Sequence, residues 1–340
     1  MNVLRMPCPV ITVAGTNGKG STIAFIESIA QAAGLKTGVY TSPHFLRYNE
    51  RIRINGDDIS DAALVKAFEA IEQARVEIPL TYFEFGTLAA LFIFARSKLD
   101  VAVLEVGLGG RLDAVNIIDA DVSVITTVDI DHQAYLGSDR ESIGFEKAGI
   151  MRSGKPCILG EKDPPSSVLK YAYEQGVYCV RGFSDYLIDL SGNNWVWREP
   201  GFQLELPYPS LSAPVQVQNA ACAIAALRAS SLEINTKAWA KGVQNAQIIG
   251  RMQCWQSNPE IILDVAHNAQ SVEQLANWLA QNPKPTSAVF CALKDKDIAA
   301  MIVQMQPYIT HWYVGELSEP AERVCSIAEL LTIFRTQLKD

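Results

Sequence analysis

The chain has 340 residues, which is long enough for two domains with a large hydrophobic core. With a net charge of −8 the chain has no overall positive field that would attract nucleic acid or anionic lipid, so local cations must hold any anionic ligand. The seven scattered cysteines form no Cys-x-x-Cys pair and indicate neither a disulfide framework nor a structural zinc site, which favours the reducing cytoplasm. No apolar run has the length of a membrane span, and Pro7 interrupts the first residues too early for a signal peptide.

Alternating strand and helix patterns predict an α/β fold with a mainly parallel sheet covered by helices. Gly34 is expected to cap the first helix at its C-terminus, and Ser60 to cap a later helix at its N-terminus. In chain order we expect strand 10–13, helix 22–33, strand 38–41, helices 60–75 and 85–97, strands 100–106, 122–128 and 155–159, a further helix, and strand 177–180.

The pattern changes after residue 180, where residues alternate on both sides of Gly192 and predict an antiparallel hairpin. A second α/β series begins near Gly250. We therefore place a domain boundary near Cys254, with domains over 1–254 and 255–340. The expected elements here are the hairpin 185–198, strand 202–206, helix 217–229, strand 261–265, helix 271–280, strand 288–291, helix 297–306, strand 311–314 and helix 326–337.

Residues 15–22 read Gly-Thr-Asn-Gly-Lys-Gly-Ser-Thr and directly follow the first apolar strand. Glycines let backbone N–H groups approach phosphate oxygens, Lys19 supplies a cation, Ser21 offers a hydroxyl to Mg²⁺, and a helix begins here. The spacing differs from the ordinary Walker pattern, which has four residues between its first glycine and Gly-Lys-Ser/Thr. The sequence predicts a phosphate loop, and the alternative is a tight strand–helix turn with an exposed lysine.

Polar residues follow three further strands, and parallel strands bring their carboxyl ends to one ligand-binding edge of a sheet. Ser42, Glu105 and His132 lie at these ends and could together hold Mg²⁺ ions that bridge nucleotide phosphates. Each has an alternative. Ser42 could form a local turn before Pro43, Glu105 could pair with Arg111, and His132 could be a hydrogen-bonded core histidine.

Lys147 closes the helix that follows the third of these clusters. It could pair with a phosphate or be carbamylated by CO₂, but the sequence alone favours a solvated lysine at a helix C-terminus. Arg251 at the domain joint could close onto a γ-phosphate or form a linker ion pair. Asp264 and His267 follow a strand as site residues do, whereas Asn268 is also an expected helix cap.

Together these residues resemble the folylpolyglutamate synthase/dihydrofolate synthase family of the Mur ligase superfamily, and most closely its bacterial bifunctional enzymes. The matching strings occur in family order over most of the chain, at residues 15–21, 41–44, 82–87, 105–113, 131–132, 146–150, 250–251 and 264–268.

The resemblance implies a P-loop-containing, Mur-ligase-like ATPase domain and a smaller, Rossmann-like C-terminal glutamate ligase domain. It implies an amide ligase in which a pterin-bearing carboxylate attacks the γ-phosphorus of MgATP. The α-amine of L-glutamate then attacks the acyl phosphate, with ADP and phosphate as products. The expected ligands are ATP, L-glutamate, dihydropteroate or folates, Mg²⁺ and a monovalent cation. The protein is expected to be a cytoplasmic monomer that binds neither nucleic acid nor membrane.

The resemblance also implies residue roles. Phe83 suits stacking on a pterin ring. Lys147 matches the lysine that the family carbamylates to N6-carboxylysine. The other implied roles are catalysis by Lys19, His132 and His267, ATP binding by Gly18, Lys19, Gly20, Ser21, Asn219, Arg251 and Asp264, metal binding by Ser42, Glu105 and His132, and pterin binding by Thr81, Phe83, Glu84, Arg111 and Asp113.

The chain departs from the family pattern at both ends, where we expect it to be truncated. The first strand begins within ten residues of Met1, and the chain stops at Asp340 before the family's last strand and helix. Dihydropteroate binding is the function most affected, and an apolar face or sheet edge of the second domain is expected to be exposed.

Three alternative functions remain. One is a truncated, catalytically inactive paralogue that retains nucleotide or folate binding. A cell-wall Mur ligase is disfavoured because no UDP-binding domain is present. An ordinary P-loop kinase or GTPase is disfavoured by the lysine spacing and by the second α/β domain.

Overall fold

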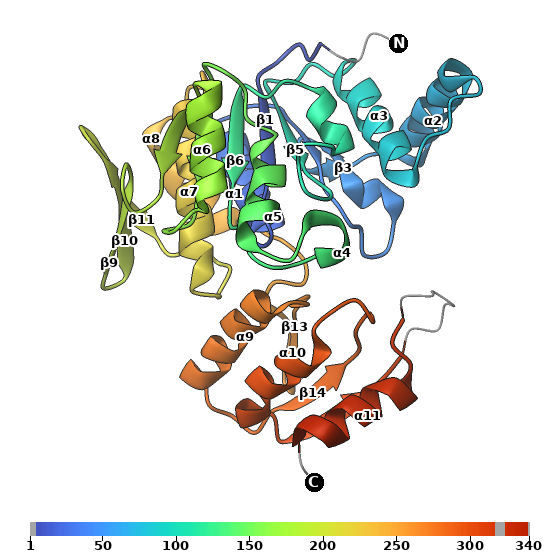
Figure 1. The fold of residues 1–340 in the computed structure, drawn as a ribbon. Coiled ribbons are helices and arrows are strands. Elements are labelled where there is room, and N and C mark those ends of the chain that lie inside the picture. The colour runs from blue at the N-terminus through green and yellow to red at the C-terminus, as the bar shows by residue number, and fades with distance from the viewer. Residues whose placement is uncertain (1–4, 317–323, 339–340) are drawn as a thin grey trace. The chain divides into compact units, whose positions relative to one another are not determined.

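The structure is a computed structural model that describes residues 5–316 and 324–338. The chain forms two compact units (Figure 1). The first unit comprises Met1–Ser210 and Gln216–Ile248, and the second comprises Leu211–Val215 and Ile249–Asp340. None of the helices in the described residues combines the length and apolar character needed to cross a membrane.

The first unit is built on an eight-stranded sheet with the order β4-β3-β2-β5-β1-β6-β7-β8. The strands from β2 to β8 in this order run parallel, and β3 and β4 add an antiparallel edge. This confirms the predicted α/β fold with a mainly parallel sheet. The strands are β1 (Val10–Ala14), β2 (Thr37–Tyr40), β3 (Ile52–Ile54), β4 (Asp57–Asp58), β5 (Val101–Glu105), β6 (Val122–Ile125), β7 (Pro156–Leu159) and β8 (Tyr178–Arg181).

The register of the central strands decides which residues meet at the carboxyl edge of the sheet. Val13 of β1 is opposite Glu105 of β5, and Ala14 is opposite Ile125 of β6. Every residue of β1 and β5 is buried, as expected for parallel strands covered on both faces. The segments that follow β1, β5 and β6 therefore begin side by side.

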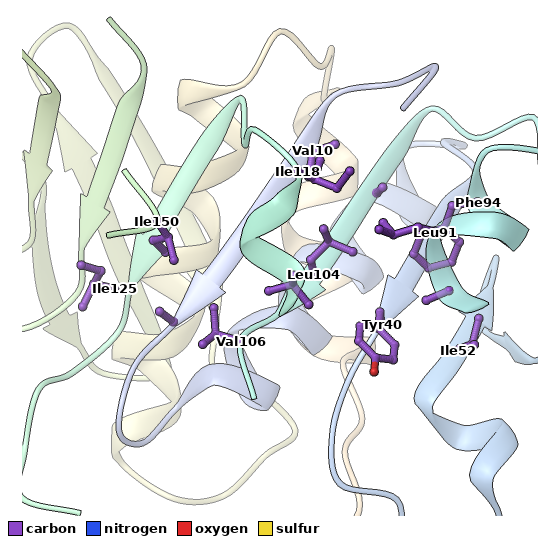
Figure 2. Packing of buried hydrophobic residues seen from close by; sticks show 14 of the residues in the cluster. Val10, Tyr40, Ile52, Leu91, Phe94, Leu104, Val106, Ile118, Ile125 and Ile150 are labelled. Carbon is purple, nitrogen blue, oxygen red and sulfur yellow. The ribbon is translucent and has the colours of Figure 1, made fainter. Parts of the chain in front are cut away.

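Helices cover both faces of this sheet. Four of them share one hydrophobic cluster with the strands: α2 (Asp61–Arg75), α3 (Tyr82–Phe94), α5 (Arg140–Ala148) and α6 (Ser166–Gln175). Figure 2 shows this packing, with Tyr40 and Leu104 of the strands near Leu91 and Phe94 of α3. Two other helices, α1 (Lys19–Ala32) and α8 (Thr236–Asn245), pack against each other, and a Cβ on Gly242 would come within 2.4 Å of the Cα of Ile29.

A three-stranded antiparallel sheet completes the first unit together with α7 (Val215–Ala229). The indole N–H of the buried Trp197 donates to the Ala221 carbonyl of α7 at 3.1 Å. The first two strands of this sheet pair antiparallel on either side of Gly192, which confirms the predicted hairpin. Its strands are β9 (Leu187–Ser191), β10 (Asn194–Glu199) and β11 (Phe202–Pro207).

In the described part of the chain, the second unit contains an antiparallel pair of strands, a parallel pair and three α-helices. Phe290, Trp312 and Phe334 form an aromatic cluster in its core. On the parallel pair, Val289 is 88% exposed and Tyr313 is 59% exposed among the described residues. The elements are β12 (Gln253–Ser257), β13 (Glu260–Leu263), α9 (Ala269–Gln281), β14 (Ser287–Phe290), α10 (Ile298–Met305), β15 (His311–Val314) and α11 (Ile327–Leu338).

Two predicted helix starts were three residues late. Helix α1 begins at Lys19 because Gly18, with φ 84°, makes the turn before it, and Thr22 is buried within the helix. Helix α3 begins at Tyr82 because Thr81 and Glu84 form a capping box. The predicted caps at Gly34 and Ser60 are confirmed, since Gly34 has φ 86° and the Ser60 hydroxyl accepts from Ala63 N–H. Helix α8 and the strands β3, β4 and β12 were missed.

Candidate active site

The loop between β1 and α1 is closely packed where its backbone turns. Gly15 has φ 153°, and a Cβ there would lie 1.9 Å from the Thr126 hydroxyl. Gly18 has φ 84°, and its Cβ would lie 2.6 Å from the side-chain oxygen of Asn219 on α7. Glycine is therefore required at both positions. The fold also brings Asn219, a predicted ATP-binding residue, to the loop.

The first turns of α1 contain buried hydroxyls that lack a partner. The side-chain oxygens of Ser21 and Thr22 accept or donate no hydrogen bond among the described residues, although both residues are almost fully buried. Lys19 Nζ donates to the carbonyls of Gly15 at 2.8 Å and Thr16 at 3.3 Å. A buried hydroxyl without a partner is costly, and a phosphate oxygen or a metal ion would satisfy it. Ser21 thus fits the predicted phosphate and magnesium site.

Ser42 and Glu105 meet at the neighbouring strand ends. The Ser42 backbone N–H donates to Glu105 Oε2 at 3.1 Å, and Glu105 is 5% exposed. Arg111 pairs instead with Glu146, at 2.9 Å between Nη2 and Oε1, so the proposed Glu105–Arg111 pair is wrong. The carboxylate of Glu105 is thus held beside the backbone of Ser42.

His132 lies in the loop after β6 and precedes the short helix α4 (Gln133–Leu136). Its φ of 51° places it in the left-handed region, and its backbone N–H donates to Asp131 Oδ1 at 2.8 Å. Its side chain is 36% exposed, so the core-histidine interpretation is wrong. Among the described residues, no three His, Cys, Asp or Glu side chains are grouped to hold a metal. The predicted metal ligands are the hydroxyl of Ser42, the carboxylate of Glu105 and the imidazole of His132. Mg²⁺ can complete its coordination with water and phosphate oxygens.

Lys147 is buried, so the solvated-lysine interpretation favoured by the sequence is wrong. Lys147 is 4% exposed because the loop after β5 covers the last turn of α5. A Cβ on Gly110 of that loop would lie 3.1 Å from the Lys147 Cα. Burial, together with the nearby charge of Lys19, lowers the pKa of Lys147 to about 7, although Asp131 and Asp113 oppose the shift. Lys147 is therefore in electrostatic reach of the phosphate loop.

The predicted pterin residues lie on α3 and on the loop after β5. The side chains of Thr81 and Glu84 satisfy each other's backbone N–H groups in the capping box. Phe83 packs on Gly107, where a Cβ would lie 2.6 Å from the ring. Asp113 accepts from the backbone N–H groups of Leu108 and Val115, and burial raises its pKa. The structure thus brings Phe83 to the loop that carries Asp113.

The second unit assembles its own group of predicted site residues. Asp264 accepts from the backbone N–H groups of Met252 and Ala266, both at 2.8 Å, and burial raises its pKa while Arg251 and His267 lower it. The His267 ring lies 2.9 Å from the Val265 carbonyl. Asn268 caps α9, which confirms that alternative. Asp264 therefore ties the segments that carry Arg251 and His267 together.

Sequence reasoning missed Thr126, Thr127 and Arg140. Thr126 and Thr127 hydrogen-bond to the Asn17 backbone of the phosphate loop, and Arg140 bonds to the Val128 carbonyl. Two threonines at the carboxyl end of an apolar strand were the available signal. They form no known motif, so nothing in the sequence marked them as site residues.

Comparison with known proteins places this geometry in a family. Residues 13–227 match the Mur ligase middle domain, and residues 250–338 match the Mur ligase glutamate ligase domain. The chain is 46% identical over 324 residues to the dihydrofolate synthase/folylpolyglutamate synthase of Escherichia coli K12, covering 94% of this chain and 76% of that protein. The chain belongs to the dihydrofolate synthase/folylpolyglutamate synthase family.

Solved structures of the dihydrofolate synthase/folylpolyglutamate synthase family have the same fold. An Escherichia coli member in complex with DHPP and ADP is 44% identical, with a TM-score of 0.92 over 97% of this chain and 79% of that chain. The bifunctional Yersinia pestis member with AMPPNP and a Mn ion is 43% identical, with a TM-score of 0.90, over 100% of this chain and 85% of that chain. The resemblance seen in the sequence is confirmed.

Proposed function

We propose that this chain is an ATP-dependent ligase that joins L-glutamate to dihydropteroate and to folates through an acyl phosphate, releasing ADP and phosphate. The family membership and the relatives solved with ADP or with AMPPNP and a Mn ion support this function. The observation in the chain itself that carries it is the buried Ser21 hydroxyl without a partner, in a glycine loop beside Glu105.

The residues present fit a divalent metal ion, which we propose to be Mg²⁺. The hydroxyls of Ser21 and Ser42, the carboxylate of Glu105 and the imidazole of His132 would hold it together with water and phosphate oxygens. When bound, the ion neutralises phosphate charge so that a carboxylate can approach the γ-phosphorus. Gly18, Lys19 and Gly20 would bind the phosphates, with Asn219 beside them.

Lys19 and Lys147 are proposed to have different roles beside the phosphates. Lys19 Nζ, which donates to two carbonyls of its own loop, would donate to phosphate oxygens when the nucleotide binds. Lys147, with its pKa lowered to about 7, is largely a neutral amine above neutral pH. Its Nζ lone pair can bond to the carbon of CO₂ with loss of one proton, which gives N6-carboxylysine and a net negative charge. We propose this modified form, near Asp131, for the active enzyme.

The remaining roles follow from the family correspondence. We propose that Phe83 stacks on the pterin, with Thr81, Glu84, Arg111 and Asp113 around it. Arg251 and Asp264 are assigned to ATP, and His267 to the glutamate step. We further propose a monomeric, cytoplasmic enzyme that responds to a monovalent cation. Gel filtration tests whether the enzyme is a monomer. Turnover with K⁺ replaced by a bulky organic cation tests the response to a monovalent cation.

The experiment that tests this function measures ADP release by the purified chain with ATP, Mg²⁺ and L-glutamate. Dihydropteroate and tetrahydrofolate are supplied in separate reactions, and mass spectrometry of the pterin product counts the added glutamates. We expect ADP release that requires both glutamate and a pterin substrate. Folded protein that binds ADP and gives no glutamylated product with either substrate would favour the inactive-paralogue alternative instead.

A further inference from the structure

The segment between β6 and His132 is hydrogen-bonded along its length to the phosphate loop. Thr16 N–H donates to the Thr127 carbonyl at 2.8 Å, and Asn17 N–H donates to the Thr127 hydroxyl at 3.1 Å. The Thr16 hydroxyl exchanges hydrogen bonds with the backbone of Asp129, at 3.0 and 2.9 Å. The two segments are about 110 residues apart in sequence but share one hydrogen-bond network. Displacing one of them therefore displaces the other.

The peptide of Val128, in the middle of this segment, is gripped from both sides. The Arg140 Nε–H donates to the Val128 carbonyl at 2.8 Å, and Glu161 Oε1 accepts from the Val128 N–H at 3.0 Å. Arg140 begins α5, and Glu161 lies two residues beyond β7. Each therefore anchors the segment to a different element of the rigid sheet-and-helix scaffold.

Arg140 and Glu161 also hold each other. Arg140 Nη2 donates to Glu161 Oε2 and to the Asp163 carbonyl, both at 2.8 Å. Burial raises the pKa of Glu161 to about 7, against the opposing effects of Arg140 and the Val128 N–H. The carboxyl group keeps an acceptor oxygen for Val128 whether or not it is protonated. The hold on the Val128 peptide therefore depends on hydrogen-bond geometry and not on the charge of Glu161.

We propose that Arg140 and Glu161 are positioning residues for nucleotide binding: by clamping the Val128 peptide they fix the segment that is hydrogen-bonded to the phosphate loop. Neither residue touches the nucleotide in this role. The inference rests on the proposed function for its substrate, MgATP. We expect the folate side of the site, on α3 and the loop after β5, to be affected less than MgATP binding.

The test compares Glu161→Ala, Glu161→Gln and Arg140→Lys in the full chain. Glu161→Ala removes the acceptor for Val128 N–H, and we expect the KM for MgATP to rise at least tenfold while the KM for glutamate and for the pterin substrate stays within twofold. Glu161→Gln retains an acceptor oxygen and is expected to restore most of the ATP affinity. Arg140→Lys keeps the charge but loses the Nε donor, so it should weaken MgATP binding even if Glu161→Ala folds poorly.

Asp121→Ala is the matched control. Asp121 also accepts from one backbone N–H, of Val10, and from one cation, of Lys155, but at the opposite ends of β1 and β6. We expect it to leave the KM for MgATP unchanged. Hydrogen exchange adds a direct readout, since the amides of Thr16 and Asn17 should exchange faster in Glu161→Ala and not in Asp121→Ala.

Three results would overturn the clamp. The first is an unchanged KM for MgATP in both Glu161→Ala and Arg140→Lys. The others are a rise in KM for MgATP as large as that of Glu161→Ala in Glu161→Gln, which would assign the effect to charge, or in Asp121→Ala. Calorimetric binding of MgADP separates the clamp from the proposed function. Weaker MgADP binding by Glu161→Ala supports the clamp even if the wild-type chain ligates no glutamate. A wild-type chain that binds no MgADP defeats both.

Discussion

Asn219 of α7 lies against Gly18 of the phosphate loop, so closely that a Cβ on Gly18 would come within 2.6 Å of the Asn219 side-chain oxygen. Asn219 is buried, and its amide donates to Gln216 Oε1 at 3.0 Å, which fixes its orientation. The backbone of the phosphate loop at Gly18 is therefore constrained by α7, a helix about two hundred positions later in the chain. This contact, together with the positive φ, requires glycine at position 18.

Gly18→Ala should weaken both folding and nucleotide binding. The left-handed backbone costs about 1 kcal/mol for any residue with a Cβ, and the contact with Asn219 adds to this cost. Gly34→Ala is the matched control, because Gly34 has φ 86° and open space around its Cβ position. Urea unfolding should show a clearly larger loss of unfolding free energy for Gly18→Ala than for Gly34→Ala. Equal losses would mean that the contact with Asn219 relaxes without cost.

Lys19→Ala should abolish ATP-dependent ligation and leave stability nearly unchanged. In the folded chain Lys19 Nζ donates to the carbonyls of Gly15 and Thr16, which belong to its own loop, so these bonds do not join distant elements of the fold. Turnover and thermal melting are measured together, with the exposed Lys66→Ala as the control. A large drop in melting temperature for Lys19→Ala would instead support a structural role for the lysine.

His132→Ala should raise the Mg²⁺ concentration needed for half-maximal ligation, by about tenfold if one ligand is lost. Titration of Mg²⁺ at saturating ATP measures this. His311→Ala, an exposed histidine of β15, serves as the control. An unchanged Mg²⁺ requirement in His132→Ala would remove this residue from the metal site.

Lys147→Met should stabilise the unligated protein, and by less as the pH rises above 7. The pKa of Lys147 is lowered from 10.5 to about 7 in the folded state, so between these values the unfolded chain binds a proton that the folded chain does not. The unfolding free energy of the wild type should therefore rise relative to Lys147→Met by up to about 1.4 kcal/mol per pH unit in this range. Below pH 7 the difference should be constant.

Urea unfolding at pH 7 and pH 9, in buffer free of CO₂, measures the Lys147 effect. Lys170→Met is the control, because the Lys170 side chain is 75% exposed and should show no such pH dependence. A pH-independent difference for Lys147→Met would show that the lysine stays protonated in the fold.

Much of the fold could be predicted because its signals are local. The apolar runs of β1 and β5, the hydroxyl of Ser60 and the glycine at position 34 each act within a few residues. Helix α8 was missed, although Asn235 caps it, because no tertiary partner is visible in the sequence. Its burial depends on α1, where Gly242 allows the two helices to approach closely.

The candidate site was predictable by type and less so by environment. Lys19 and Glu105 were found because a strand end followed by such residues is a recognisable pattern. Lys147 was misjudged because a lysine in the last turn of a helix is ordinarily solvated. Its burial arises from the loop after β5, which is 37 positions away at Gly110.

The sequence by itself determined the alternating fold, the glycine–lysine phosphate loop and the family to which the chain belongs. These depend on backbone freedom, periodicity and residue type, which are properties of short segments. Only the tertiary structure decided that Lys147 is buried with a lowered pKa and that Arg140 and Glu161 hold the Val128 peptide. Burial and hydrogen-bond partners are contributed by distant segments, and the sheet register alone brings those segments together.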